Sequence, residues 1–164
     1  MSDTDSQATI PEAARKLATL LGTWTVSGSM RTGERSAQVS GCWVFDRVAN
    51  GHGIRVAGQT AIEGMGSFEE EELIGVDPWD GTLHFFSLNR FAVRDHRGGW
   101  TDEHTLYVEY QGDQGGEHCR EGITIEISGD QMNSRILETI DGEPAITTIL
   151  TLVRERSGAS FPGR

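Results

Sequence analysis

Residues 68–89 carry the sequence FEEEELIGVDPWDGTLHFFSLN, which shows the strand and turn pattern on which the predicted fold rests. Two runs with strand-like alternation flank the segment DPWDG at 77–81. Pro78 stands where a type I turn prefers proline, and Gly81 supplies the left-handed position that follows. The stretch therefore predicts two antiparallel strands, near 68–77 and 82–90, joined by a tight turn.

The same rhythm of strand and turn continues in both directions. The 164 residues include 21 glycines, and turn signals recur about every 10 to 15 positions, as in sandwiches and barrels. Strands are predicted at 23–31, 34–46, 52–62, 68–77, 82–90, 91–97, 103–111, 117–128, 131–139 and 143–155. Successive hairpins of this kind predict an all-β fold, a ten-stranded antiparallel up-and-down β-barrel, because closing the meander removes its exposed edges.

The two ends of the chain complete the predicted architecture. The segment PEAARKLATLLG at 11–22 has apolar residues at helical spacing, a proline in its first turn and a glycine after its end. These signals predict a short N-terminal helix. We expect one barrel domain over residues 10–156, a disordered segment at 1–9 and a flexible tail at 157–164.

Turn lengths predict which side chains share a face, because alternate strand residues point to opposite sides. A two-residue loop at Thr32-Gly33 would place Trp24 opposite Gly41, and a four-residue loop at 48–51 would place Gly41 beside Gly58. A three-residue loop at 140–142 would turn the last strand inward. The inner face of the first three strands is then predicted to carry Trp24, Val26, Met30, Val39, Trp43, Phe45, Ile54, Val56 and Ile62.

Composition excludes several classes of function. Acidic residues outnumber basic ones 25 to 14, which gives a formal net charge of −11 and disfavours binding to nucleic acid or anionic membranes. Two cysteines, no export signal at the start and no long apolar run predict a cytoplasmic protein. The chain carries no metal-ligand spacing, nucleophile elbow or phosphate-binding loop, so we expect no metal and no cofactor.

Two short motifs resemble a known family. Gly22-Thr23-Trp24, with Arg154 on the last strand, resembles the signature of lipocalins and their calycin relatives, in which such an arginine packs across the tryptophan. The segment LIGVD at 73–77 is similar to bacterial lipocalin-like proteins of unknown function. Nitrobindin-like haem barrels are more distant relatives that share the Gly-Thr-Trp start. They bind haem through a histidine near the C-terminus, and no histidine follows His118 here, so haem is not expected.

The run of four glutamates at 69–72 offers candidate chemistry. If Phe68 and Ile74 face inward, Glu70 and Glu72 do too, and a buried carboxylate must be paired, hydrated or protonated. With Ser87 and Asn89 across the ladder, these acids could bind a hydroxyl or amine, or act as a general acid or base. The alternative is that both acids lie at the open rim in bulk water.

A second acidic pair is predicted on the last strands. Glu121 and Glu138 are expected to be cross-strand neighbours, so that the pKa of one carboxyl should rise; alternatively both are solvated at strand ends. His104 shares the phase of Leu106 and Val108 and is the histidine expected to reach the interior. Its alternative role is structural.

These observations support two main hypotheses. The first is a barrel that binds a small, partly hydrophobic or amphiphilic molecule in its interior. The second is a cofactor-independent isomerase, cyclase or hydratase that uses inward carboxylates and a histidine for proton transfer. A filled barrel that acts through its surface, as a homodimer, is the third alternative. The predicted ligand-binding residues are Trp43, Glu70, Glu72, Phe85, Ser87, Asn89, His104, Glu121, Ser134 and Glu138.

Overall fold

The computed structural model describes residues 10–156, so the predicted disordered segment 1–9 and tail 157–164 lie outside the described residues. A short helix, α1 (Glu12–Lys16), continues into the 3-10 turn η1 (Leu17–Leu20). A second 3-10 turn is η2 (Ala49–Gly51). The strands are β1 (Gly22–Thr32), β2 (Arg35–Val48), β3 (Gly53–Ile62), β4 (Gly66–Val76), β5 (Leu83–Asn89), β6 (Val93–Trp100), β7 (Thr105–Gln114), β8 (Glu117–Ser128), β9 (Gln131–Ile140) and β10 (Glu143–Arg154).

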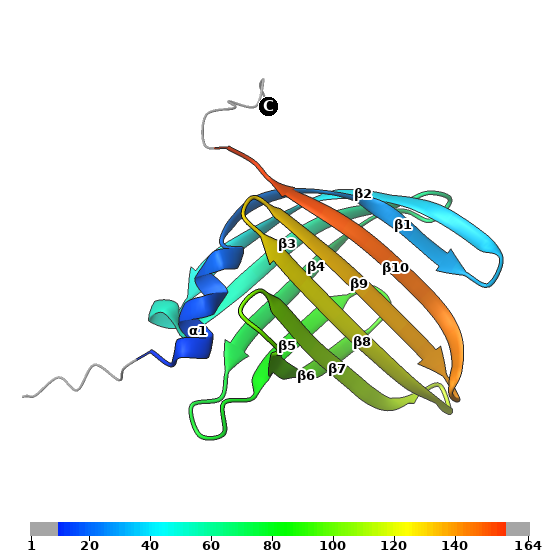
Figure 1. The fold of residues 1–164 in the computed structure, drawn as a ribbon. Coiled ribbons are helices and arrows are strands. Elements are labelled where there is room, and N and C mark those ends of the chain that lie inside the picture. Colours follow the sequence, from blue (N-terminus) through cyan, green and yellow to red (C-terminus); the bar gives the residue numbers. More distant parts are fainter. Residues whose placement is uncertain (1–9, 157–164) are drawn as a thin grey trace, which may run out of the picture.

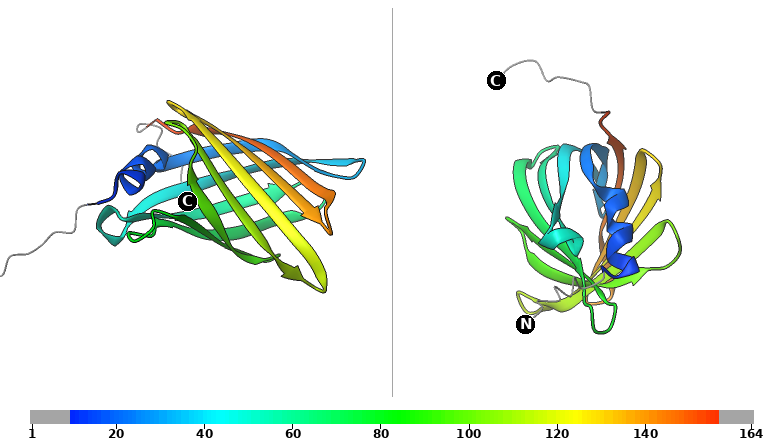
Figure 2. Two further views of the ribbon diagram at one scale, coloured as in Figure 1. Left: turned by 60° about the horizontal axis from the view of Figure 1, so that its bottom comes forward. Right: turned by 90° about the vertical axis from the view of Figure 1, so that its left-hand side faces the viewer.

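The ten strands form one closed antiparallel barrel, as predicted (Figure 1). Each strand pairs with the next in the sequence, and β10 closes the ring on β1. Figure 2 shows α1 at one end of the barrel, where β1 begins. The turns that follow odd-numbered strands therefore lie at the opposite end. None of the helical segments in residues 10–156 has the length and hydropathy of a membrane span.

Trp24 and Arg154 close the barrel at the end covered by α1. The two residues are paired across β1 and β10, and the guanidinium carbon of Arg154 lies 4.2 Å from the centre of the indole. A cation in this position stabilises the contact by about 0.5–2 kcal/mol. The indole N–H donates to the carbonyl of Leu20 at 2.8 Å, and Arg154 donates to the carbonyls of Thr19 and Leu21. These side-chain hydrogen bonds attach the carbonyl end of the η1 turn, and with it the N-terminal helical segment, to the barrel.

Apolar side chains fill the half of the interior next to α1. They come from the last turn before β1 and from the strand ends that meet there, and the hydrophobic effect of burying each is about 1.5–3 kcal/mol. Those exposed by 2% or less include Leu17, Leu20, Trp24, Ile54, Ile74, Leu83, Leu106 and Leu152. This packed layer forms a floor beneath the remaining space in the barrel.

The first two hairpins differ from the predicted register by two residues. Thr32 pairs with Arg35, so the β1–β2 turn is centred one residue later than expected, and Trp24 lies opposite Trp43 instead of Gly41. The β2–β3 connection is displaced in the same way, and Trp43 pairs with Gly58. A shift of two residues preserves side-chain parity. The predicted inner face is therefore correct although its row partners are not.

The last hairpin reaches the predicted faces by a different route. Ile140 pairs with Glu143 across a two-residue turn, Asp141-Gly142, in which both residues have positive φ, as type I′ turns require. The predicted three-residue loop is wrong. A bulge between Pro144 and Ile146 adds the missing residue and restores the phase. The side chains of β10 consequently face inward at the expected positions.

Candidate functional site

The half of the barrel away from α1 contains a cavity of about 510 Å³. Its wall is largely apolar and aromatic, and it includes Met30, Trp43, Phe68, Phe85, Ile123 and Ile136. Mouth residues such as Met65 and Phe91 are 41% and 52% exposed, whereas Ile74 in the floor is 2% exposed. The space therefore opens at the end opposite α1 and ends at the packed floor.

Nine of the ten predicted site residues line this cavity: Trp43, Glu70, Glu72, Phe85, Ser87, Asn89, Glu121, Ser134 and Glu138. Within this set, the side-chain oxygen of Asn89 accepts bonds from the backbone N–H groups of Phe91 and Ala92 in the β5–β6 turn. The roles of the nine predicted residues in binding remain predictions, but the structure places all of them around one cavity.

His104 does not reach the interior, and its predicted orientation is wrong. It is exposed and lies in the turn before β7, which begins at Thr105. The side chain of Asp102 accepts bonds from the backbone N–H groups of His104 and Thr105, both at 2.8 Å, and shapes this turn. Leu106 and Val108 alternate because they belong to β7. His104 precedes this strand, so the alternation does not extend to it.

Glu70 lies on the inner face of β4, against an aromatic partner. The Thr60 hydroxyl donates to Glu70, and the Trp43 indole N–H donates to that hydroxyl at 3.0 Å. Burial raises the pKa of Glu70 although these hydrogen bonds oppose the shift. A Cβ on Gly58 would lie 2.7 Å from the Trp43 ring and 2.9 Å from the Glu70 side chain. Glycine thus makes room here for the Trp43 indole.

Glu72 lies deeper on the same face and is only 8% exposed. It lines the cavity, and no hydrogen bond contributes to its titration; burial raises its pKa well above the usual value, and the charges of Glu70 and Glu121 raise it further. The rim alternative is therefore wrong for Glu72. A raised pKa favours the protonated form of this carboxyl group, which can donate a hydrogen bond or give up its proton.

Glu121 and Glu138 are cross-strand partners, as predicted, but an arginine separates their charges. Nη1 of Arg94 donates to Glu121 at 2.6 Å and to Glu138 at 2.7 Å, and Nη2 donates to Gln114 at 2.6 Å. Burial tends to raise the pKa of Glu121, but His96 and Arg94 outweigh it and the pKa is lowered. The prediction of a raised pKa in this pair is wrong for Glu121, because a cation lies between the two acids.

His96 is the histidine that the interior contains. It is fully buried, with Nδ1 3.1 Å from the carbonyl of Phe85 and Nε2 2.6 Å from a carboxylate oxygen of Glu121. A carbonyl only accepts, so Nδ1 carries a hydrogen. The contact between Nε2 and Glu121 is then a hydrogen bond that needs a second proton, carried by the imidazole or by the carboxyl group.

Arg94 and His96 are interior residues that the sequence pattern did not predict. On β6, Arg94 and His96 lie on the face opposite to Val93. Alternation would place the apolar Val93 inward, but its side chain is 56% exposed. Ladder pairing of β6 with β7 covers only Arg97 to Trp100, so Arg94 bridges to β7, β8 and β9 through its side chain. Charge balance is the signal that could have found it, because two neighbouring inward carboxylates require a cation.

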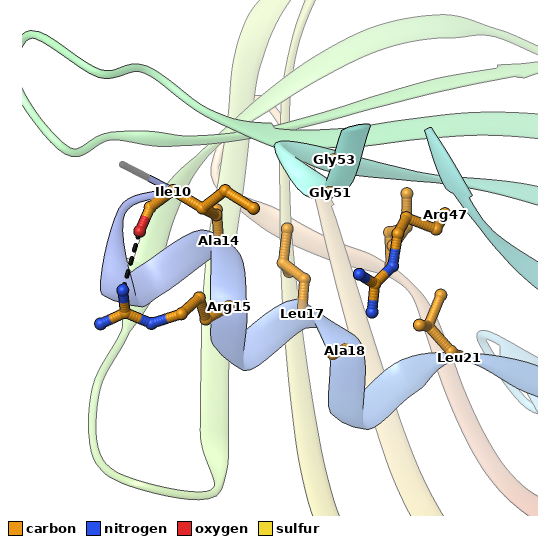
Figure 3. A pocket seen from close by; sticks show the side chains of 10 residues that line it. Ile10, Ala14, Arg15, Leu17, Ala18, Leu21, Arg47, Gly51 and Gly53 are labelled. Atoms are coloured by element: carbon orange, nitrogen blue, oxygen red, sulfur yellow. Dashed lines mark hydrogen bonds between the residues drawn. The ribbon is translucent and has the colours of Figure 1, made fainter. Parts of the chain in front are cut away.

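A second hollow lies outside the barrel, between α1 and η2 (Figure 3). Its volume is about 290 Å³, and its lining is mostly aliphatic, with the exposed Arg47 beside it. Arg15 next to it donates to the carbonyl of Ile10 at 3.0 Å. Among residues 10–156, no group of three His, Cys, Asp or Glu side chains is arranged to hold a metal ion. The interior cavity has the larger volume and contains the buried acids, so it is the candidate site.

Comparison with known proteins identifies the fold but no family. No family model matches the chain, and no curated protein matches it by sequence. The chain is similar in structure to Rv2717c from M. tuberculosis, with a TM-score of 0.70 and 17% identity, over 90% of this chain and 99% of that one. It is also similar to the S-type phycobiliprotein lyase CPES from Guillardia theta, with a TM-score of 0.61 and 11% identity, over 86% and 91%. The ten-stranded antiparallel barrel predicted from the sequence is confirmed, and the likeness to lipocalins and to nitrobindin-like barrels stays a prediction.

Proposed function

We propose that this barrel binds a small, partly hydrophobic molecule in its interior, with the polar part of that molecule at the β4 acids, Glu70 and Glu72. The observation that carries the proposal is the one-ended cavity of about 510 Å³. Ligand sites are typically concave, apolar and of this size, with a few convergent polar groups that set orientation. An apolar body would enter at the end opposite α1 and stop at the packed floor.

Binding of Nile red, a neutral polarity-sensitive dye, tests this proposal. We expect the wild-type protein to enhance its fluorescence, and Ser87→Trp to abolish the effect, because Ser87 lines the cavity and an indole there would occupy the space. The matched control is Leu88→Trp, since Leu88 is 47% exposed on the outer face of the same strand. Equal fluorescence in both variants would mean that the dye binds elsewhere and would overturn the proposal.

A second candidate, proton-transfer catalysis, is favoured by the 2.6 Å hydrogen bond between Nε2 of His96 and Glu121. Together with the unpartnered acid Glu72, it would supply a donor and an acceptor in one cavity. A cavity lined only by hydrocarbon would have excluded this candidate. Native mass spectrometry of protein purified from its own host bears on the two: a single retained mass favours binding, and two retained masses that differ by one water favour a hydratase.

The cytoplasmic location, the homodimer alternative and the absence of nucleic-acid or membrane partners stay predictions from the sequence. The outer surface has exposed apolar residues on β4 and β5, including Leu73 at 52% and Phe86 at 41%, which are paired across the two strands. Sedimentation of the purified protein would show whether these residues serve an interface between copies.

A further inference from the structure

The cations of the cavity already have partners. Both terminal nitrogens of Arg94 donate to protein oxygens, and its Nε is buried without a partner, out of reach of the open space. Both ring nitrogens of His96 are likewise engaged. Arg94 and His96 are therefore already bound to carboxylates of the protein, and an anionic head group would have to compete with Glu121 and Glu138 for them.

The acids of β4 are in the opposite situation. Glu72 is more than nine-tenths buried, lines the cavity and has no hydrogen bond that stabilises its charge. Glu70 is held only by neutral donors, Thr60 and, beyond it, Trp43. The two carboxyls are two residues apart on one face, so their backbone positions are separated by about 6.6 Å. A small cation placed at Glu72 would also feel the charge of Glu70.

The charges that face Glu72 leave the cavity acidic. Its strand neighbours, Val56 on β3 and Ser87 on β5, carry no charge. The ionisable groups around it are Glu70 on β4, Arg94 and His96 on β6, Glu121 on β8 and Glu138 on β9. Including Glu72, four carboxyls thus face one guanidinium and one imidazole, so the acids exceed the cations by two even when His96 is charged.

Aromatic side chains adjoin these acids. Trp43 and Glu70 are close enough that both would contact a Cβ on Gly58. Phe68 precedes Glu70 on the same face, and Phe85 lies on β5, next to the row that contains Glu72. Aromatic faces next to carboxylates attract ammonium groups, with a contribution of about 0.5–2 kcal/mol from each cation–π contact.

From this arrangement we infer that the ligand is a hydrophobic amine, bound as its ammonium ion at Glu72 with Glu70 beside it, and that binding releases the proton of Glu72 to solvent. This inference rests on the proposed binding function and adds the ligand class. The balance is simple: a carboxylic acid and an ammonium ion become an ion pair and one free proton. The raised pKa of empty Glu72 has its first cause in burial, which a bound cation would offset.

Three probes that differ only in their head group test the inference by displacement of Nile red. They are 1-naphthylmethylamine, 1-naphthylmethanol and 1-naphthoate. At about pH 7 we expect the amine to compete at least about tenfold more strongly than the alcohol, and the carboxylate to compete weakest. If Nile red does not bind inside the cavity, the proposed function fails. If it binds and the alcohol competes as well as the amine, only the ligand class is wrong.

Glu72→Gln supplies the residue-level test. We expect amine competition to fall about tenfold or more, to the level of the alcohol, which should itself be unchanged. The matched control is Glu71→Gln, which removes the same charge one residue away on the outer face, where Glu71 pairs with Arg55. Equal losses in the two variants would show a long-range effect of net charge and would overturn the assignment to Glu72.

Proton release gives a readout that needs only the wild-type fold. Calorimetry of amine binding in two buffers with different ionisation enthalpies should show a net release of protons, because a bound cation lowers the raised pKa of Glu72. Binding of the alcohol should release none, and Glu72→Gln should abolish the release by the amine. Amine binding without proton release in the wild-type protein would overturn the inference.

Discussion

The two acidic walls of the cavity contain the same residue type in the same inward phase, but their environments differ. On β8 and β9, Glu121 and Glu138 both contact Nη1 of Arg94. On β4, Glu72 has no cationic partner, and its pKa is raised well above normal by burial, whereas that of Glu121 is lowered. The difference shows that an inward glutamate becomes structural or available for a ligand according to whether a cation reaches it.

Arg94→Met should have the largest effect on this contrast. It would leave Glu121 and Glu138 adjacent in a site where their side chains are 15% and 13% exposed, and loss of one partner from a buried charge cluster costs about 3–5 kcal/mol. Urea unfolding at neutral pH measures the loss. Arg120→Met is the control, because its pair with Glu109 lies on the surface with the arginine 57% exposed. An equal loss in both variants would mean that Arg94 does not organise the cavity.

Glu121→Gln should have an intermediate effect that depends on pH. Removal of its charge-assisted bonds to His96 and Arg94 should cost about 1.5–3 kcal/mol at neutral pH. The folded pKa lies below the usual value of 4.5, so this stabilisation is present above that value and is lost as the pH falls through the folded pKa. Unfolding curves between about pH 3 and pH 7 should therefore converge at the acid end.

The control for this experiment is Glu126→Gln, on the exposed face of the same strand. Its stability should follow that of the wild-type protein across the whole range. A difference between wild type and Glu121→Gln that grows toward acid pH would contradict the assigned direction of the pKa shift.

Glu72→Gln should have the smallest effect on stability at acid pH. At higher pH it should stabilise the protein, whereas the two substitutions above destabilise it. Below about pH 4.5 the acid is protonated in both folded and unfolded states, so the two proteins should agree within about 0.5 kcal/mol. Because the folded pKa is raised, the wild-type protein loses stability as the pH rises toward that pKa, and the glutamine variant does not. Thermal melts at about pH 4 and pH 9 measure this. A variant less stable than wild type at the higher pH would indicate that Glu72 is ionised and paired.

The sequence predicted side-chain parity more reliably than pairing. The β1–β2 register moved by two residues and the β9–β10 turn lost one, yet the inner faces agree with the prediction. Both outcomes have a physical cause, because burial of apolar side chains constrains which face points inward, and bulges or shifted turns absorb the remaining difference. The prediction that His104 faces inward was wrong because this residue lies before the start of β7.

The features that could be predicted from the sequence are local: ten strand segments, the approximate positions of their turns and the side of the sheet on which each glutamate lies. These follow from alternation and turn chemistry, which involve residues near one another in the chain. Only the tertiary structure decided which acids acquire a cation. Arg94 reaches Glu121 and Glu138, 27 and 44 residues away, across the stretch where β6 and β7 are not paired. That choice depends on closure of the barrel, which brings distant strands around one interior.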